Sequence, residues 1–248
     1  MSYLKREKYH SRVPKAVKAL IIGFEVIFRG PHDDQTIPDK TLARLSSLLD
    51  TEGHNVGAPR LSYLFNMHLG DRAKKIEATR METSLDALVE NVLLDLEIDE
   101  PSIETRLVEE IAMGKAGQFT GAEEAVQFLE SVKDANLKIG LICNSPVGIP
   151  PVYMRRVIEA AGLTSYLEDT QFSSENGMVR PHARPYRYCI SNMNTSPQDT
   201  AVLTGLTGEV AILEKLGFGP VFMPDNESAC DRRHAVGIHA LSEISRYL

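Results

Sequence analysis

The sequence lacks the features that mark secreted, membrane-spanning and nucleic-acid-binding proteins. Only three of its 248 residues are cysteines, and they form no CxxC pair, so we expect a reducing compartment and no disulfide framework. The longest apolar run, about Ala19 to Phe28, is interrupted by Gly23 and Glu25 and is far shorter than the roughly 20 residues that cross a bilayer. The first residues are polar and charged, unlike a signal peptide. These absences predict a cytoplasmic protein with no membrane partner.

The sequence also lacks an excess of positive charge, because its 34 acidic residues outnumber its 27 Lys and Arg residues. The formal net charge of −7 and the pI near 5.6 argue against nucleic acid as a partner, because nucleic-acid-binding domains carry clustered Lys and Arg. The composition, 43% hydrophobic and 25% charged, is that of a globular protein, and the length fits a core with a smaller appended domain. Basic residues cluster at the N-terminus, where we expect a solvated arm over residues 1–15; the cluster is Lys5, Arg6, Lys8, Arg12, Lys15 and Lys18.

The spacing of apolar residues changes twice along the chain. Ala19 to Ile22 predicts a short buried strand, and between residues 39 and 114 apolar residues recur at helical spacing. Thr120 and Glu123 then predict a capping box at the start of a helix. Beyond it, predicted helices alternate with short strands at 137–143, 172–174, 200–204 and 220–223. Such alternation predicts an α/β fold, with a parallel sheet, helices on both of its faces and an inserted helical bundle.

The predicted strands place several residues at one edge of the sheet. Ligands of parallel α/β sheets bind at the carboxyl ends of the strands. The residues that the sequence places there are Gly23, Asn144, Ser145, Gly205 and Leu206. We therefore take this edge as the candidate site.

Six short segments carry a resemblance to a known family. They are FTGAEEAVQFL at 119–129, LKIGLICNS at 137–145, AAGLTSYLED at 160–169, SENGMVRP at 174–181, AVLTG at 201–205 and AILEKLG at 211–217. Their order and spacing resemble the haloacid dehalogenase (HAD) superfamily, in the branch with a helical cap inserted after the first strand. The resemblance implies a HAD-like Rossmannoid core over residues 16–32 and 115–248, a cap over 33–114 and hydrolase-like chemistry.

The first motif of that superfamily is altered in this chain. Its first strand usually ends in Asp-x-Asp-Gly-Thr, where the first Asp is the nucleophile and helps to hold magnesium, and the second is the general acid and base. Here the chain has Gly23-Phe24-Glu25, and a glycine can neither attack nor bind a metal. Glu25 keeps a carboxylate at the acid/base position and is the candidate catalytic residue. Its apolar neighbours Phe24, Val26 and Ile27 predict a raised pKa, which suits a general acid.

The other motifs implied by the resemblance are altered as well. Cys143 stands where a Ser or Thr hydroxyl is usual, and we interpret it as a buried strand cysteine. The alternative is a reactive thiol, which would need a nearby cation to lower its pKa; Arg180 is the candidate for that cation. Arg180, before Pro181, replaces the usual Lys and keeps its positive charge. Leu206, after Gly205, replaces an Asp that completes the magnesium site.

These changes predict a site without a magnesium cofactor or any other metal. Mg²⁺ prefers oxygen ligands that include carboxylates, but only Glu25 clearly remains, with Asp33, Asp34 and Glu209 as candidate replacements. We expect a pocket that takes a small anion or another small organic ligand. The candidate ligand-binding residues are Gly23, Phe24, Cys143, Asn144, Ser145, Arg180, His182 and Gly205.

Three functions fit this pattern. The first is a pseudoenzyme that serves as a binding or assembly module, as a homodimer or with a protein partner. The second is a repurposed enzyme in which Glu25 does acid/base chemistry on a small organic substrate without a covalent step. The third is a divergent HAD-family hydrolase whose nucleophile is Asp33 or Asp34.

Overall fold

The computed structural model describes residues 17–30, 36–224 and 235–246; the predictions for the arm 1–15 and for Asp33 and Asp34 lie outside this part of the chain. Within it, six strands form one sheet in the order β3-β2-β1-β4-β5-β6, and each neighbouring pair is parallel. The strands are β1 Ala19–Gly23, β2 Lys138–Cys143, β3 Asp169–Phe172, β4 Thr200–Leu203, β5 Val221–Pro224 and β6 Val236–Ile238.

The central strand β1 has the composition of a strand that is covered on both faces. All five of its residues are buried, and it lies between β2 and β4. Such a strand has no polar alternation because helices cover both sides of a parallel sheet. Gly23 is level with Ile142 of β2, and Ile22 is level with Leu203 of β4. The register therefore brings the carboxyl ends of three strands to one edge.

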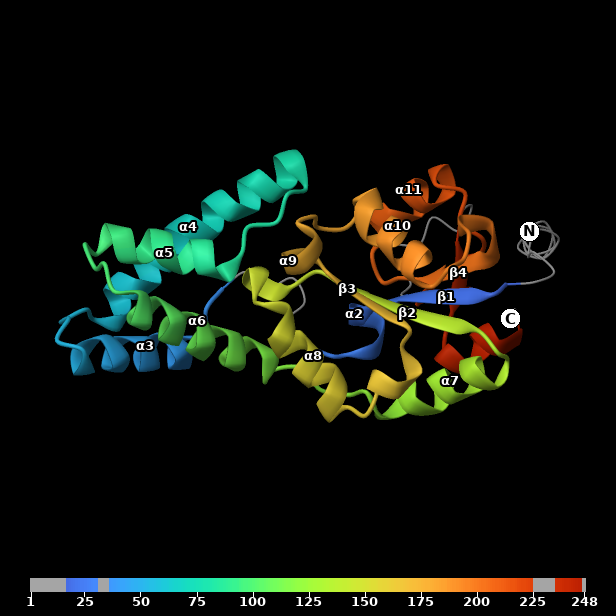
Figure 1. The fold of residues 1–248 in the computed structure, drawn as a ribbon, viewed down its shortest axis with the longest axis horizontal. Helices are drawn as coiled ribbons and strands as arrows, with labels where there is room; N and C mark the ends of the chain where they lie inside the picture. The colour runs from blue at the N-terminus through green and yellow to red at the C-terminus, as the bar shows by residue number, and fades with distance from the viewer. Residues whose placement is uncertain (1–16, 31–35, 225–234, 247–248) are drawn as a thin grey trace.

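Helices cover both faces of the sheet, as predicted (Figure 1). Leu20 and Ile22 of β1 belong to the hydrophobic cluster that includes α7 Glu123–Asp134 and α8 Pro151–Ala160. Ile21 belongs to the second cluster, with residues of α10 Ala183–Asn192 and α11 Val210–Lys215. No helix among the described residues is both long enough and apolar enough to cross a bilayer. The shorter helical elements are α2 Phe24–Ile27, α9 Ser173–Asn176 and the 3₁₀ turns Pro146–Gly148, Thr164–Tyr166, Pro197–Asp199, Thr207–Glu209 and Leu241–Arg246.

The described part of the insert between β1 and β2 is a helical bundle, as predicted. Figure 1 shows it beyond the carboxyl ends of the strands. Leu61, Leu64 and Phe65 are buried, whereas Met67 remains 39% exposed. The inward apolar face of each helix therefore packs against its neighbours and the larger cluster. The helices are α3 Asp39–Thr51, α4 Ala58–Thr79, α5 Leu85–Asp95 and α6 Pro101–Ala116.

Two local predictions are wrong. Helix α7 begins at Glu123 with Ala122 as its N-cap, so Thr120 does not form the predicted capping box. Thr120 instead exchanges two backbone hydrogen bonds with Arg29, of 2.8 and 2.9 Å, and its backbone is therefore extended before the helix starts. The predicted strand at 172–174 is displaced, because β3 ends at Phe172 and α9 begins at the next residue.

Candidate functional site

Two glycines leave room for the carboxylate of Glu25 at the end of β1. Glu25 lies in the short helix α2, directly after the strand, and its side chain folds back over Gly23. A Cβ atom on Gly23 would lie 2.3 Å from Glu25 Oε1, and a Cβ on Gly205 would lie 3.0 Å from Glu25 Cγ. The space that a side chain at position 23 would occupy is therefore filled by Glu25.

Glu25 is one of two carboxylates that grip the guanidinium of Arg180. Arg180 Nη1 and Nη2 donate to the two oxygens of Glu25 at 2.9 and 2.8 Å. Its Nε and Nη2 donate to the two oxygens of Glu209 at 2.5 and 2.9 Å. The exposed fractions of these side chains are 1% for Arg180, 14% for Glu25 and 0% for Glu209. We call this buried group the Glu25–Arg180–Glu209 triad.

Neighbouring groups complete the hydrogen bonding of the triad. Arg180 Nη1 also donates to the Ile142 carbonyl at 2.9 Å, and Nη2 donates to Thr204 Oγ1 at 3.2 Å. The Gly205 N–H donates to Glu25 at 2.9 Å, and the Thr204 hydroxyl donates to Glu209. Every guanidinium nitrogen thus has an acceptor. Arg180 is held as an internal partner of the two carboxylates, and its donors are used within the protein.

The electrostatics of the triad correct the expected behaviour of Glu25. Burial by itself would raise its pKa, but the charge and hydrogen bonds of Arg180, with the Gly205 N–H, outweigh burial and lower the pKa. The two carboxylates in turn outweigh burial at Arg180 and raise its pKa. The prediction that apolar neighbours raise the pKa of Glu25 is therefore wrong. Glu25 is a carboxylate at neutral pH and has no proton to donate.

Cys143 is buried and held as a thiol. Burial raises its pKa well above the ordinary range, with further contributions from the negative charges of Glu25 and Glu82, and the opposing effect of Arg180 is too small to reverse the shift. Its Sγ lies 3.3 Å from the Asn144 carbonyl oxygen, which accepts the S–H hydrogen bond. Burial, the hydrogen bond and the raised pKa all match a strand cysteine in the core and oppose an activated thiolate.

Other predicted site residues support the loops or the core. Asn144 Oδ1 accepts from the Arg180 backbone N–H at 2.8 Å, and the Ser145 N–H donates to Ser173 Oγ at 2.7 Å. Phe24 is 1% exposed and stacks on Phe28, with ring centroids 4.3 Å apart. Asn144 and Ser145 therefore lie beside the triad, whereas Phe24 is part of the core.

His182 lies at the start of α10, outside the lining of the cleft described below. Its Nδ1 accepts from the Arg184 N–H at 3.1 Å, which caps the helix. Partial burial and the charges of Arg184 and Arg187 lower its pKa, so the ring is neutral at pH 7. This arrangement gives His182 a structural role at the end of the loop between α9 and α10.

A cleft of about 470 Å³ lies between the core loops and the end of α4. Sequence reasoning anticipated its core side, including Asn144, Ser145, Gly205 and Leu206, but it missed the pairing of Glu209 with Arg180. It also missed the opposite wall, where Arg72 of α4 pairs with Glu82 at 2.5 Å. The charged lining residues are three arginines and three glutamates: Arg72, Arg80, Arg180, Glu77, Glu82 and Glu209.

The described residues at this edge of the sheet do not fit a magnesium ion. Mg²⁺ needs oxygen ligands at 2.0–2.1 Å in nearly octahedral geometry. The oxygens of Glu25 and Glu209 instead face the guanidinium of Arg180, and a cation placed among them would meet that positive charge. Within the described residues, no group of three His, Cys, Asp or Glu side chains has a metal-binding arrangement.

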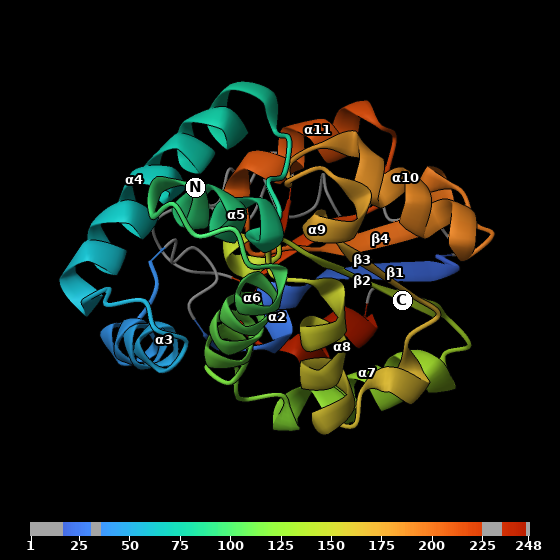
Figure 2. The same ribbon diagram turned by 60° about the vertical axis from the view of Figure 1, so that its left-hand side comes forward.

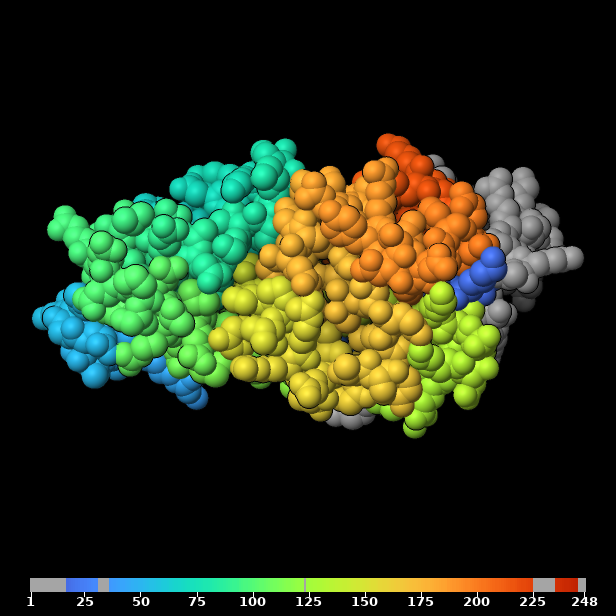
Figure 3. All heavy atoms as spheres, viewed as in Figure 1, coloured from blue at the N-terminus to red at the C-terminus, as the bar shows by residue number. Residues whose placement is uncertain are grey.

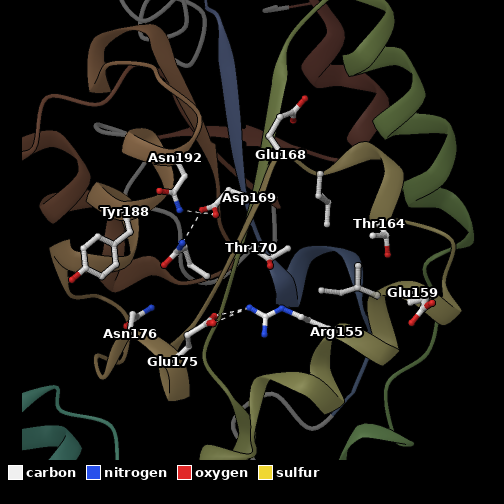
Figure 4. A pocket seen from close by; sticks show the side chains of 13 residues that line it. Arg155, Glu159, Thr164, Glu168, Asp169, Thr170, Glu175, Asn176, Tyr188 and Asn192 are labelled. Atoms are coloured by element: carbon white, nitrogen blue, oxygen red, sulfur yellow. Dashed lines mark hydrogen bonds and ion pairs between the residues drawn. The ribbon is translucent and has the colours of Figure 1, made fainter.

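A second pocket, of about 680 Å³, lies at the outer edge of β3 between α8 and α10 (Figure 4). Two contacts join polar groups of its lining: Arg155 pairs with Glu175 at 2.8 Å, and Asn192 donates a hydrogen bond to Asp169 at 2.9 Å. The pocket lies away from the point where the ends of β1, β2 and β4 meet. The cleft above the triad therefore remains the candidate site.

Comparisons with known proteins identify the fold. No family model matches the sequence, and no curated protein sequence matches it. Solved structures do match: a 2-haloacid dehalogenase from Pseudomonas syringae pv. Tomato DC3000 has a TM-score of 0.66 at 15% identity, over 93% of this chain and 97% of that one. A HAD phosphatase from Thermococcus onnurineus has a TM-score of 0.50 at 14% identity, over 92% and 96%.

A further match adds a structure with magnesium. The Bacillus subtilis protein YfnB, described as a HAD-hydrolase bound to magnesium with interdomain movement, has a TM-score of 0.52 at 12% identity, over 94% of this chain and 98% of that one. At these identities the matches establish the fold, and the chain has the HAD-like fold that its segment order predicted.

Proposed function

We propose that this HAD-fold protein is a catalytically silent binding or assembly module. The observation that carries the proposal is the Glu25–Arg180–Glu209 triad at the carboxyl end of β1. Covalent catalysis at this point would need a nucleophilic atom on residue 23, which is a glycine. The nearest carboxylate, Glu25, is committed to Arg180.

The triad also opposes chemistry without a covalent step. A general acid must carry a proton at the working pH, and the lowered pKa of Glu25 keeps it ionised. A general base must reach a substrate proton, but both oxygens of Glu25 accept from Arg180 and 14% of its side chain is exposed. Turnover by this residue would first require breaking a buried bidentate ion pair.

The cleft gives such a module a place for a small ligand. Its volume of about 470 Å³ falls within the range of small-molecule sites. Its three arginines and three glutamates balance in charge, and Arg180 has no donor left for an anion. These features support a polar organic ligand over phosphate. A protein partner, or a second copy in a homodimer, would then bind at another surface.

The test is an activity assay with a metal titration. We expect no hydrolysis of p-nitrophenyl phosphate or release of halide from 2-chloropropionate above the buffer rate, with or without Mg²⁺. Isothermal titration with Mg²⁺ should give no binding heat. An active HAD phosphatase run in parallel controls for the conditions.

The hydrolase alternative predicts the opposite result. If Asp33 or Asp34 is the nucleophile, Mg²⁺-dependent hydrolysis appears in the wild type and is abolished in Asp33→Asn or Asp34→Asn. That outcome would replace the silent module with an enzyme. Loss of activity in Glu25→Gln alone would instead favour the repurposed acid/base enzyme.

A further inference from the structure

The connector between α4 and α5, residues 80–84, reaches out of the helical insert and pairs with the core. Arg80 ends α4 in the left-handed region, with φ 58°, and turns the chain toward the core. Met81 then forms an antiparallel bridge with Met178. The Val179 N–H donates to the Arg80 carbonyl at 2.8 Å, and the Glu82 N–H donates to the Gly177 carbonyl at 3.0 Å; both partners lie in the core loop after α9.

A buried ion pair strengthens this contact. The side chains of Arg72 and Glu82 are each 3% exposed, and both belong to the insert. The second oxygen of Glu82 accepts from the Ser173 hydroxyl at 2.6 Å, and Ser173 Oγ accepts from the Ser145 N–H at 2.7 Å. A continuous polar chain thus runs from α4, through the connector, to the loop after β2. If the insert moved away, the polar groups of this chain would lose their partners. Because these groups are buried, that loss would cost free energy.

Close backbone packing adds a third element. Gly148, in the loop after β2, has φ +72°, and a Cβ atom placed there would lie 2.2 Å from the Thr83 carbonyl oxygen. A side chain at this position would therefore push the connector off the core. The insert and the core also meet along the face shown in Figure 3.

The connector is separate from the covalent links between insert and core. Figure 2 shows one of those links, where the chain passes from α6 to α7. Within it Thr120 exchanges two backbone hydrogen bonds with Arg29, and we call this pair of residues the neck. A hinge motion needs linkers whose backbone dihedrals can rotate, and it needs the other contacts between the two parts to be weak. Here rotation about the neck would break the Met81–Met178 bridge and the contact between Glu82 and Ser173.

We propose that the connector 80–84 locks the insert onto the core, so that the cleft above the triad has one fixed width and does not open and close. The lock also reaches the triad. Val179, which bonds the connector, directly precedes Arg180, whose own N–H is held by Asn144. Displacing the connector therefore disturbs the loop that positions the guanidinium. The inference concerns motion and stands whether or not the protein is catalytically silent.

Distance measurement by double electron–electron resonance tests the lock. Spin labels are placed at Lys74→Cys on α4, whose side chain is 80% exposed, and at exposed Arg187→Cys on α10, in a background where Cys230 is serine. The buried Cys143 and Cys189 stay unlabelled in the folded protein. We expect one narrow distance distribution that Mg²⁺ and inorganic phosphate leave unchanged. Two populations, or a broad distribution, in this otherwise unaltered protein would overturn the proposal.

Two matched pairs of variants assign the lock to the connector. Gly148→Ala should add a second distance population, whereas Gly162→Ala, with nearly the same φ of +71° but no atom within 4 Å of its Cβ, should not. Ser173→Ala removes the donor to Glu82 and should broaden the distribution, whereas Ser174→Ala removes only a contact with Ser145 inside the core. The serine pair keeps the test decisive if Gly148→Ala fails to fold. Unchanged distributions in both Gly148→Ala and Ser173→Ala would contradict the assignment.

Discussion

Removing the charge of Arg180 should destabilise the protein far more than removing the whole triad. Arg180→Met keeps an unbranched side chain of similar length but leaves two carboxylates, Glu25 and Glu209, without their cation. Breaking a buried ion pair by deleting one partner costs about 3–5 kcal/mol, because the remaining charge is both buried and unpaired. Typical domains are stable by about 5–15 kcal/mol, so this single change would remove a large part of the total.

The triple variant Glu25→Leu/Arg180→Met/Glu209→Leu separates the charge from the packing. It removes all three charges while keeping side chains of similar volume, and replacing a complete buried ion network by apolar side chains is often neutral. We therefore expect it to recover most of the loss, to within about 2 kcal/mol of the wild type.

Urea denaturation followed by circular dichroism measures both variants, with the slope of the transition checked for two-state behaviour. A loss below about 1 kcal/mol in Arg180→Met would refute the reasoning, because an exposed ion pair gives a value of that size. A triple variant as unstable as Arg180→Met would show that the loss comes from packing and not from unpaired charge.

Three further predictions concern the same site. The pKa of Glu25 is lowered on folding, so the ionised carboxylate stabilises the folded state fully above its ordinary pKa of about 4.5, and this stabilisation is lost as the pH falls below that value. The free energy of unfolding should therefore fall less steeply with decreasing pH in Glu25→Gln than in the wild type. An identical acid limb in both proteins would count against the ion pair. Gly23 has an ordinary φ of −69°, but the Cβ of Gly23→Ala would lie against the Glu25 carboxylate, so this variant should lose about 1–3 kcal/mol of unfolding free energy in urea melts. The loss should be small in a Glu25→Ala background, and also in the control Gly208→Ala, whose Cβ meets no atom within 4 Å. Cys143 should resist iodoacetamide at pH 8 until the protein unfolds, while an exposed thiol from Leu94→Cys reacts at once, and rapid alkylation of native Cys143 would contradict its raised pKa.

The fold was predictable because its signals are local. The apolar run before Gly23 and the alternation of helices and strands after residue 120 each follow from residues close together in the sequence. Strand β6 gave no such signal, because its three residues, Val236–Ile238, are too few to show a period. Thr120 was misassigned for a related reason: its pairing with Arg29, 91 positions away, overrides the capping pattern around it.

The candidate site was predictable in place but not in chemistry. Strand ends put Gly23, Asn144 and Gly205 together, and the structure has them there. The sequence could not reveal that Glu25 folds back to Arg180, because the two lie 155 positions apart and Gly23 gives no sign of what fills its space. Two features of the sequence were the available signal for a buried triad: Arg180 stands where a Lys is usual, and Glu209 adds a carboxylate just after the end of another strand.

A crystal structure of the protein grown with millimolar Mg²⁺ tests the central claim most directly. We predict that the guanidinium of Arg180 lies between the carboxylates of Glu25 and Glu209, with no divalent ion beside Gly23. A metal ion coordinated by Glu25 or Glu209, with Arg180 displaced from them, would contradict the account.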